Sequence, residues 1–320
     1  MNQILNEDEL TKYRMDINFL KPIIQVILEK ENISSYETQL FENGSSIVID
    51  IGNNSILKIF PLFFKKDFEA ELNGLKILNL HNINFIPKIH RYGEVENYNY
   101  IIVSKINGVT LHSVWHNIEF ENKISIMNDV GLFLKSMHSI PLDNISKKKQ
   151  DWNLFLENQI NNCTNYHAKK GVSTILLSQI DKFISQNLQS YEAENSICFL
   201  SGDVHYWNIL VEEKKGRSQI SGFIDYGDSF FGMPEYDFLA PGHFMANGGD
   251  DGLKDKTHTA KLLKPMFLSY GYSEHELNEK LSHRLFAFHL IHRFSDLSKL
   301  VKNSASNNLY ALAEQVWRFK

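Results

Sequence analysis

Residues 198–211 read CFLSGDVHYWNILV, and in this stretch two apolar runs enclose a polar loop. The first run leads to a turn at Gly202 and Asp203, and Asn208 comes just before the second run. Polar side chains on a loop between two buried segments are well placed for chemistry. Asp and Asn beside Gly are also frequent in ordinary turns, so the loop by itself fits both a functional site and a plain turn.

A second segment supplies a third polar side chain at the end of an apolar run. Residues 219–224 predict a short strand that leads directly into Asp225 and Gly227. Asp, then Asn five residues later, then a strand that ends in Asp-x-Gly is the spacing of the kinase template for phosphoryl transfer. In that template one carboxylate orients the attacking hydroxyl, and two further oxygen ligands hold Mg²⁺ against the phosphates. Asp203 fits the first role, and Asn208 and Asp225 fit the second.

Three segments together resemble the signature of the aminoglycoside phosphotransferase family, which includes antibiotic kinases, choline kinase and other small-molecule kinases. The segments are SGDVHYWN at 201–208, FIDYGD at 223–228 and GMPEYDFLA at 232–240. The family usually has His before the Gly-Asp pair, where this chain has Ser201; that position supports the catalytic loop and does no chemistry. The resemblance also implies that Asp237 is structural and steadies the catalytic loop.

The resemblance implies a fold class as well, namely α+β with the two lobes of a protein-kinase-like fold. Residues 1–106 would form a small nucleotide-binding N-lobe with an antiparallel sheet and helices. Residues 107–320 would form a larger, mostly helical C-lobe with the catalytic loop, the metal site and the acceptor-binding surface. A length of 320 residues, of which 43% are hydrophobic, suits two lobes with a substantial core.

Lys58 lies on a predicted strand with an apolar face. Ile56 and Phe60 share its side of the strand, because side chains alternate between the two faces. A Lys in such a position needs an anionic partner or a path to solvent. By the resemblance, Lys58 pairs with the α- and β-phosphates of the nucleotide and with Glu71, on a helix predicted over residues 68–78. Without the downstream motifs, an edge-strand Lys and a solvated Glu would explain the same residues.

The resemblance assigns two further segments to the nucleotide. The turn around Gly44 and Ser45 would cover the phosphates, since small residues let backbone amides approach phosphate oxygens. This turn has a single Gly and, taken alone, would be an ordinary turn. Backbone groups between Ser104 and Ile106, at the connection between the lobes, would bond the adenine edge, and the side chains there do not test this assignment.

Turn chemistry and periodicity predict the main elements. The Gly-Asn-Asn turn at 52–54 predicts a hairpin, because Gly and Asn accept positive φ. The capping-box pattern from Ser273 to Glu276 predicts that a long C-terminal helix opens at Ser273. His138 is interpreted as a helix cap and not as a ligand. Helices are further predicted over about residues 15–31 and 119–138, and from Trp152, Leu176 and Tyr310.

The composition argues against several classes of protein. With 33 basic and 38 acidic residues, the formal net charge is −5, which argues against a nucleic-acid partner. Cys163 and Cys198 are too few for a disulfide framework, and buried thiols in a reducing cytoplasm are expected. The first residues show no secretion signal, and no apolar run reaches the ~20 residues of a membrane helix. The sequence does not indicate an oligomeric state.

The sequence therefore predicts a kinase that transfers the γ-phosphoryl group of ATP or GTP, with Mg²⁺, to a hydroxyl of a small molecule. Aminoglycosides are the first choice of acceptor, with antibiotic resistance as the corresponding role, and such an acceptor would be cationic. Glu235, Asp250, Asp251 and Asp255 are candidates to receive its amino groups. The last three also fit the solvated tip of a loop.

Two alternatives stay open. A protein kinase is less favoured, because the segment after Asp225 has no Ala-Pro-Glu end marker and no clear activation loop. A nucleotide-binding scaffold without phosphotransfer is favoured by Ser201 and by the sparse turn at Gly44. The complete set of catalytic and metal-binding residues favours an enzyme.

Overall fold

The chain divides into two compact units. A computed structural model of the protein describes residues 3–34, 38–42, 44, 46–188, 197–248, 256–302, 304 and 306–320. The first unit comprises Met1–Val109, Asn208–Glu212 and Ser221–Ser229, and the second comprises Thr110–Trp207, Glu213–Ile220 and Phe230–Lys320. Two short segments that follow residue 107 in sequence therefore group with the N-terminal residues, and these segments carry Asn208 and Asp225.

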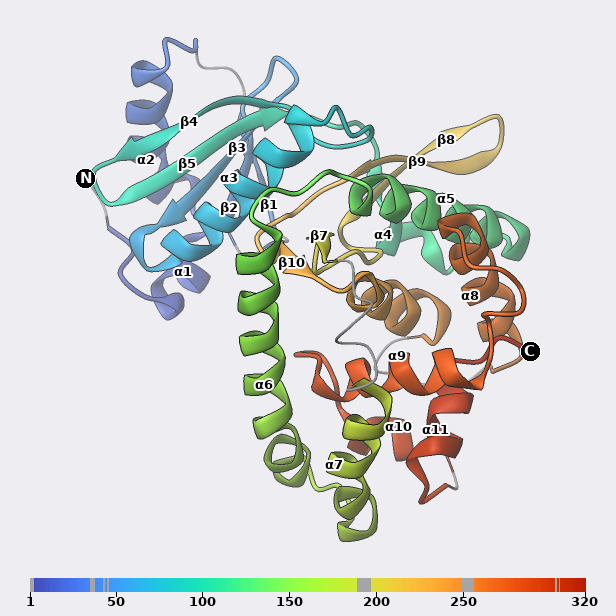
Figure 1. The fold of residues 1–320 in the computed structure, drawn as a ribbon. Coiled ribbons are helices and arrows are strands. Elements are labelled where there is room, and N and C mark those ends of the chain that lie inside the picture. Colours follow the sequence, from blue (N-terminus) through green and yellow to red (C-terminus); the bar gives the residue numbers. More distant parts are fainter. Residues whose placement is uncertain are drawn as a thin grey trace. The chain divides into compact units, whose positions relative to one another are not determined.

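The first unit is built on a five-stranded antiparallel sheet of order β1-β2-β3-β5-β4 (Figure 1). The strands are β1 (Gln39–Phe41), β2 (Ile47–Asp50), β3 (Ser55–Pro61), β4 (Ile89–Val95) and β5 (Tyr98–Ser104). Its helices are α1 (Glu7–Tyr13), α2 (Ile17–Lys30), the short η1 (Leu62–Phe64) and α3 (Lys65–Leu80). The predicted antiparallel sheet and the predicted helices at 15–31 and 68–78 are confirmed.

The hairpin between β2 and β3 explains how Lys58 is presented. Gly52, Asn53 and Asn54 all have positive φ (76°, 49° and 56°), as the sequence predicted for this turn. On β3, Leu57 and Ile59 are fully buried in a core shared with α2. Because side chains alternate along a strand, Lys58 lies on the opposite face, where ring contacts join β3 to α3.

The second unit is mostly helical. Its helices are α4 (Leu111–Trp115), α5 (Phe120–His138), α6 (Ile145–Lys169), α7 (Thr174–Leu188), η3 (Pro234–Phe238), η4 (Pro241–Ala246), α8 (Lys256–Tyr270), α9 (Glu279–Ile291), α10 (Leu297–Lys302) and α11 (Leu309–Val316). Strands β7 (Cys198–Leu200) and β10 (Phe230–Gly232) of this unit pair with each other. A further sheet of order β6-β8-β9 consists of β6 (Val109–Thr110), β8 (Ile209–Lys214) and β9 (Arg217–Phe223), whose residues are divided between the two units. Helix α5 confirms the prediction at 119–138.

Helices α5 and α8 pack unusually closely. A Cβ added at Gly131 of α5 would lie 2.1 Å from the carbonyl oxygen of Met266 on α8. Real side chains do not approach a backbone atom so closely, so this contact requires glycine.

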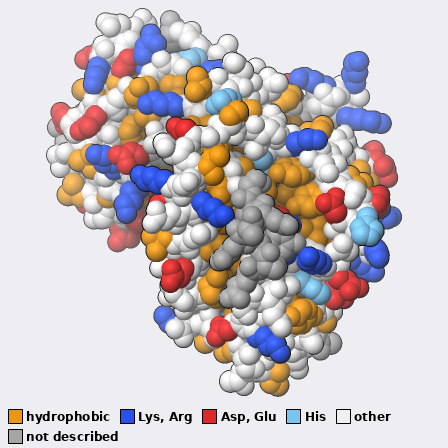
Figure 2. Space-filling view, in the orientation of Figure 1, with side chains coloured by type: hydrophobic (Ala, Val, Ile, Leu, Met, Phe, Trp, Pro, Cys, Tyr) orange, Lys and Arg blue, Asp and Glu red, His pale blue; other side chains and the backbone are white. Residues whose placement is uncertain are grey.

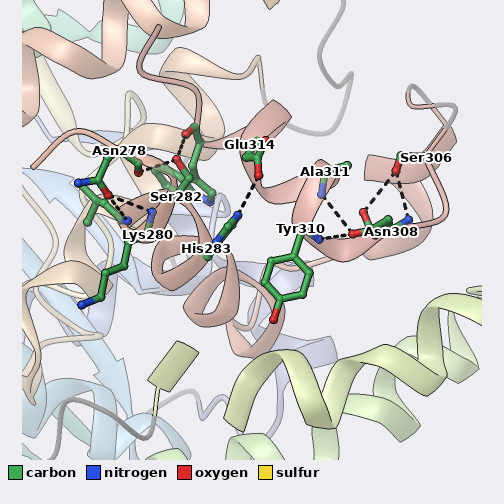
Figure 3. Close-up of polar contacts among 11 residues, drawn as sticks. Asn278, Lys280, Ser282, His283, Ser306, Asn308, Tyr310, Ala311 and Glu314 are labelled. Carbon is green, nitrogen blue, oxygen red and sulfur yellow. Dashed lines mark hydrogen bonds and ion pairs between the residues drawn. The ribbon is translucent and has the colours of Figure 1, made fainter. Parts of the chain in front are cut away.

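The C-terminal helices are fixed by caps and by a side-chain contact between His283 and Glu314 (Figure 3). Asn278 caps α9, and Asn308 caps α11; each side-chain oxygen accepts from two N–H groups of the first helical turn. His283 on α9 lies 3.0 Å from Glu314 on α11.

The predicted start of the long C-terminal helix is wrong. Ser273 does donate its backbone N–H and its hydroxyl to Glu276, so the capping-box residues contact each other. The helix nevertheless begins at Glu279, because the side-chain oxygen of Asn278 accepts from the N–H groups of Lys280 and Leu281 and so takes the cap position.

Two surface properties concern possible partners. On the face that Figure 2 shows, Lys and Arg side chains are interspersed with Asp and Glu side chains. Among the residues that the structure describes, no helix combines the length and the apolar character needed to cross a bilayer.

Candidate active site

Lys58, Glu71 and Asp225 come together in the first unit. Lys58 extends from β3, and its Nζ lies 2.5 Å from both carboxylate oxygens of Glu71 on α3. The same Nζ lies 4.0 Å from Oδ1 of Asp225, which follows β9. The side chains of Lys58 and Glu71 are only 11% and 4% exposed. Three side chains assigned from separate parts of the sequence are thus neighbours.

The charge of this group is unbalanced. Burial lowers the pKa of Lys58, but the carboxylates of Glu71 and Asp225 raise it, and the net pKa lies above the ordinary value. Burial raises the pKa of Glu71 to about 7; Lys58 opposes this, and Asp225 and Asp67 add to it. One buried cation therefore faces several carboxylates, which favours the arrival of a further cation.

Asp225 is held in a tight turn beside Asn208. Its φ is +69°, in the left-handed region that Asp tolerates better than most residues. The N–H of Gly227 donates to its Oδ1 at 3.3 Å, and its side chain stays 25% exposed. The N–H of Ile224 donates to the carbonyl oxygen of Asn208 at 2.9 Å, so the segments that carry Asn208 and Asp225 run side by side.

The residues in this part of the first unit fit Mg²⁺. Asn208 and Asp225 offer oxygen donors, and the excess of carboxylates over Lys58 supplies the negative charge that a divalent cation needs. Within the described residues, no three His, Cys, Asp or Glu side chains gather into a metal cluster. Mg²⁺ commonly uses only one or two protein carboxylates together with phosphates and water, so a sparse donor set suits it.

Asp67 is a neighbour that the sequence analysis missed. Burial raises its pKa, and the carboxylates of Asp228 and Asp225 raise it further. Asp67 stands four residues before Glu71 on α3, and residues at this spacing share one face of a helix. The four-residue spacing from Glu71 is the sequence feature from which Asp67 could have been identified.

Four residues were predicted to contact the nucleotide through their backbone groups, and their surroundings differ. Gly44 has a φ of +115°, which favours glycine, in the turn between β1 and β2. Ser45 lies outside the described residues. The N–H of Ser104 donates to the carbonyl oxygen of Lys88, and the N–H of Lys88 donates to Oγ of Ser104, at 2.8 Å each. The side chain of Ile106 packs over Gly222.

Asp203 lies in the second unit with two partners that the sequence analysis did not identify. Its Oδ1 is 3.3 Å from Nε2 of His205 and 3.0 Å from Nη2 of Arg293. Burial raises the pKa of Asp203, but the contacts with His205 and Arg293 outweigh burial, so the net pKa lies below the ordinary value. The carboxylate is therefore ionised at neutral pH.

Asp237 anchors the loop that carries Asp203. Its carboxylate accepts from the backbone N–H groups of Ser201 at 2.8 Å and Gly202 at 2.7 Å. Nε2 of His138 lies 3.1 Å from the same carboxylate. His138 thus belongs to the support of this loop, and its interpretation as a helix cap is incomplete. The loop is held through the backbone of Ser201, which does not require a His side chain there.

The residues suggested to bind amino groups of an acceptor are not borne out where the structure describes them. Glu235 is buried and forms an ion pair with Arg284. Its charge is already compensated inside the protein. Asp250, Asp251 and Asp255 lie outside the described residues.

The comparisons with known proteins show the family and the fold of the chain. The model of the phosphotransferase enzyme family matches residues 43–256, more than half of the 320-residue chain. The curated protein sequences contain no match.

Three of the solved structures that are similar to this chain each cover more than nine-tenths of it. A ternary complex of APH(2'')-IIa with streptomycin and ATP has 17% identity and a TM-score of 0.57, over 93% of this chain and 97% of that one. The ADP-bound aminoglycoside phosphotransferase APH(2'')-Ib has 20% identity and a TM-score of 0.55, over 92% and 98%. A Plasmodium vivax ethanolamine kinase has 14% identity and a TM-score of 0.56, over 98% and 95%. The predicted α+β, protein-kinase-like fold is confirmed.

Proposed function

Because the chain belongs to the phosphotransferase enzyme family, we propose that it transfers the γ-phosphoryl group of ATP or GTP to a hydroxyl group of a small molecule. The family membership also confirms the resemblance seen in the three sequence segments. The observation that carries the proposal is the convergence of Lys58, Glu71 and Asp225 from three separate segments.

The first unit would bind the nucleotide. Lys58 would neutralise negative charge on the phosphates, and Glu71 would hold the ammonium group in place. Asn208 and Asp225 would hold Mg²⁺, which supplies charge neutralisation at the transferred group when it is bound. Backbone groups at Ile106 and Ser104 are assigned to the adenine edge, and the turn with Gly44 and Ser45 to the phosphates.

Asp203 would orient the acceptor. Its ionised carboxylate accepts a hydrogen bond from the acceptor hydroxyl, whose oxygen forms the new bond to the γ-phosphorus. The bond between that phosphorus and the bridging oxygen breaks, and the nucleoside diphosphate leaves with the electron pair. The hydroxyl proton passes to Asp203 late, because the transition state is loose and develops little charge on the attacking oxygen. A carboxylate of lowered pKa suffices for this role.

Support for a nucleotide comes from the similar structures. The APH(2'')-IIa complex contains ATP, and APH(2'')-Ib is ADP-bound. Both cysteines are buried free thiols, which is consistent with the cytoplasmic location that we propose.

Aminoglycosides are the first acceptors to assay, because the similar APH(2'')-IIa structure is a complex with streptomycin and ATP. Macrolides, choline, ethanolamine, sugars and a generic protein substrate complete the panel. The measurement is Mg²⁺-dependent release of ADP or GDP with each acceptor. Release of the diphosphate with one small molecule supports the proposal. Release with the generic protein substrate and with no small molecule indicates a protein kinase. Nucleotide binding without release for any acceptor indicates a scaffold.

An Asp203→Asn variant tests the assignment of the acceptor-orienting carboxylate. We expect kcat to fall at least about 100-fold, because the variant cannot accept the hydroxyl proton. Nucleotide affinity should change little, because Lys58 and Asp225 are untouched. A variant that phosphorylates its acceptor at the wild-type rate would disprove the role of Asp203.

A further inference from the structure

Arg293 is the second partner of Asp203, and neither the motifs nor the proposed roles account for it. Its Nη2 lies 3.0 Å from Oδ1 of Asp203, on the same oxygen that faces His205. The Asp203 side chain is 19% exposed, whereas the Arg293 side chain is 50% exposed. Ion pairs with one half-exposed partner add little to the stability of a fold. We therefore expect this ion pair to affect the orientation and charge of Asp203 more than the stability of the fold.

The turn that carries Arg293, between α9 and α10, is firmly held. His292, which is 3% exposed, packs against Phe294 with ring centroids 3.9 Å apart and against Tyr236 at 4.6 Å, in tilted arrangements. The fully buried Ser295 donates its N–H to the carbonyl oxygen of His292 at 2.9 Å. Arg293 stands between these buried residues. Its backbone position is thus defined by packing, although its side chain reaches the surface.

The other end of the pair is held as well. The backbone before Asp203 is anchored by the carboxylate of Asp237, through the N–H groups of Ser201 and Gly202. Two anchored turns from distant parts of the second unit therefore meet at one carboxylate oxygen. A guanidinium group placed in this way fixes both the orientation and the charge of its partner.

We propose that Arg293 is a positioning residue that, together with His205, holds Asp203 in the orientation and the ionised state needed to receive the acceptor hydroxyl. This inference rests on the proposed function. Arg293 acts through Asp203 and forms no bond in the reaction. Among the charged and titratable groups near Asp203, His205 and Arg293 contact its carboxylate, and His292 interacts with it at longer range.

The test compares Arg293→Met, Arg293→Lys and Asp203→Asn with an Arg318→Met control. Arg318 is an exposed Arg of the same unit, which donates to the carbonyl oxygen of Lys320. The measured quantities are kcat and KM for Mg²⁺–ATP across a pH series, with the best acceptor of the panel or, without one, with water as phosphoryl acceptor. Thermal unfolding is recorded for each variant.

Arg293→Met should lower kcat by about 10- to 100-fold, as expected when a reacting group is misplaced by a fraction of an ångström. Its KM for ATP and its unfolding temperature should stay near those of the control. The acid limb of its pH–kcat profile should move to higher pH, since loss of the cation raises the pKa of Asp203. Arg293→Lys keeps the positive charge and loses the planar guanidinium group. Its kcat should lie between those of wild type and Arg293→Met, and the acid limb of its pH–kcat profile should stay at the wild-type position.

Two results would overturn the inference. One is an Arg293→Met variant as fast as the control while Asp203→Asn is slow. The other is a slow Arg293→Met variant whose acid limb stays in place, since this would show a structural role only. If Asp203→Asn is itself as fast as wild type, the proposed function fails first, so the two failures are distinguishable.

Discussion

At the scale of single residues, the candidate site is defined by an excess of negative charge around one buried Lys. Glu71 and Asp225 both face Lys58, and Asp67 lies close enough to raise the pKa of Glu71. Burial strengthens every one of these interactions, because water no longer screens them. A bound divalent cation with its nucleotide would relieve this imbalance, which is the physical basis for the proposed site.

The raised pKa of Glu71 leads to a prediction about pH. We expect kcat/KM for Mg²⁺–ATP to fall as the pH drops below about 7, since this parameter reports the free enzyme and protonation of Glu71 removes the partner of Lys58. In Glu71→Gln this decrease of kcat/KM at acid pH should be absent, and kcat/KM should be low at every pH. Glu69→Gln serves as the control, because Glu69 is on the same helix and more than half exposed. A wild-type profile without any limb near neutral pH would contradict the prediction.

Site residues that belong to a sequence motif could be identified from the sequence. Residues that approach the site only through tertiary packing could not. Asp203, Asn208 and Asp225 were found because they end apolar runs at fixed spacing. Arg293 lies far along the chain in a turn without a motif, so only the packing of the second unit brings it to Asp203. Glu235 was misjudged for the same reason, since the sequence does not show its pairing with Arg284.

At the scale of elements, periodic helices and the β2–β3 hairpin could be predicted, whereas one helix start could not. Apolar spacing reports which face of a helix is buried, and that held for α2, α3 and α5. A cap, by contrast, depends on which of several competing polar residues reaches the first N–H groups. Near α9, Ser273 and Glu276 satisfy each other in a turn, and Asn278 takes the cap.

The α9 cap can be tested by denaturation. Asn278→Ala should lower the free energy of unfolding by about 1 kcal/mol, because two N–H groups of the first turn lose their acceptor. Ser273→Ala should cost less, since its contacts lie outside the helix. Equal losses, measured by urea unfolding, would indicate that the helix start is misassigned.

At the scale of the whole molecule, each unit concentrates a different part of the proposed chemistry. The first unit contains Lys58, Glu71, Asn208 and Asp225, and the second contains Asp203 with its support. The lobe boundary predicted at residues 106 and 107 stays a prediction. The grouping of two short later segments with the N-terminal residues could not be predicted, because it depends on contacts between distant parts of the chain.

The core of the second unit predicts a loss of stability in acid. His289 is fully buried, and within the described residues neither of its ring nitrogens has a hydrogen-bond partner. Burial lowers its pKa well below the ordinary value, so the folded state resists protonation while the unfolded state accepts a proton below about pH 6.5. Stability should therefore be full above that pH and should fall as the pH decreases through it.

His289→Phe should flatten this pH dependence and raise the free energy of unfolding by about 1 kcal/mol, because an unsatisfied polar ring is replaced by an apolar one among aromatic neighbours. The exposed His81, changed to Phe, serves as the control. Unfolding curves at a series of pH values check both effects. The same slope in His289→Phe and wild type would contradict the assignment.

The most direct test of the central claim is the affinity for ATP with and without Mg²⁺, measured by calorimetry for wild type, Asp225→Asn and Asp203→Asn. We predict that Mg²⁺ strengthens ATP binding in wild type and in Asp203→Asn. In Asp225→Asn, the affinity for ATP in the presence of Mg²⁺ should be about 100-fold lower than in wild type. If Asp225→Asn binds Mg²⁺–ATP as tightly as wild type, the group formed by Lys58, Glu71 and Asp225 is not the metal–nucleotide site.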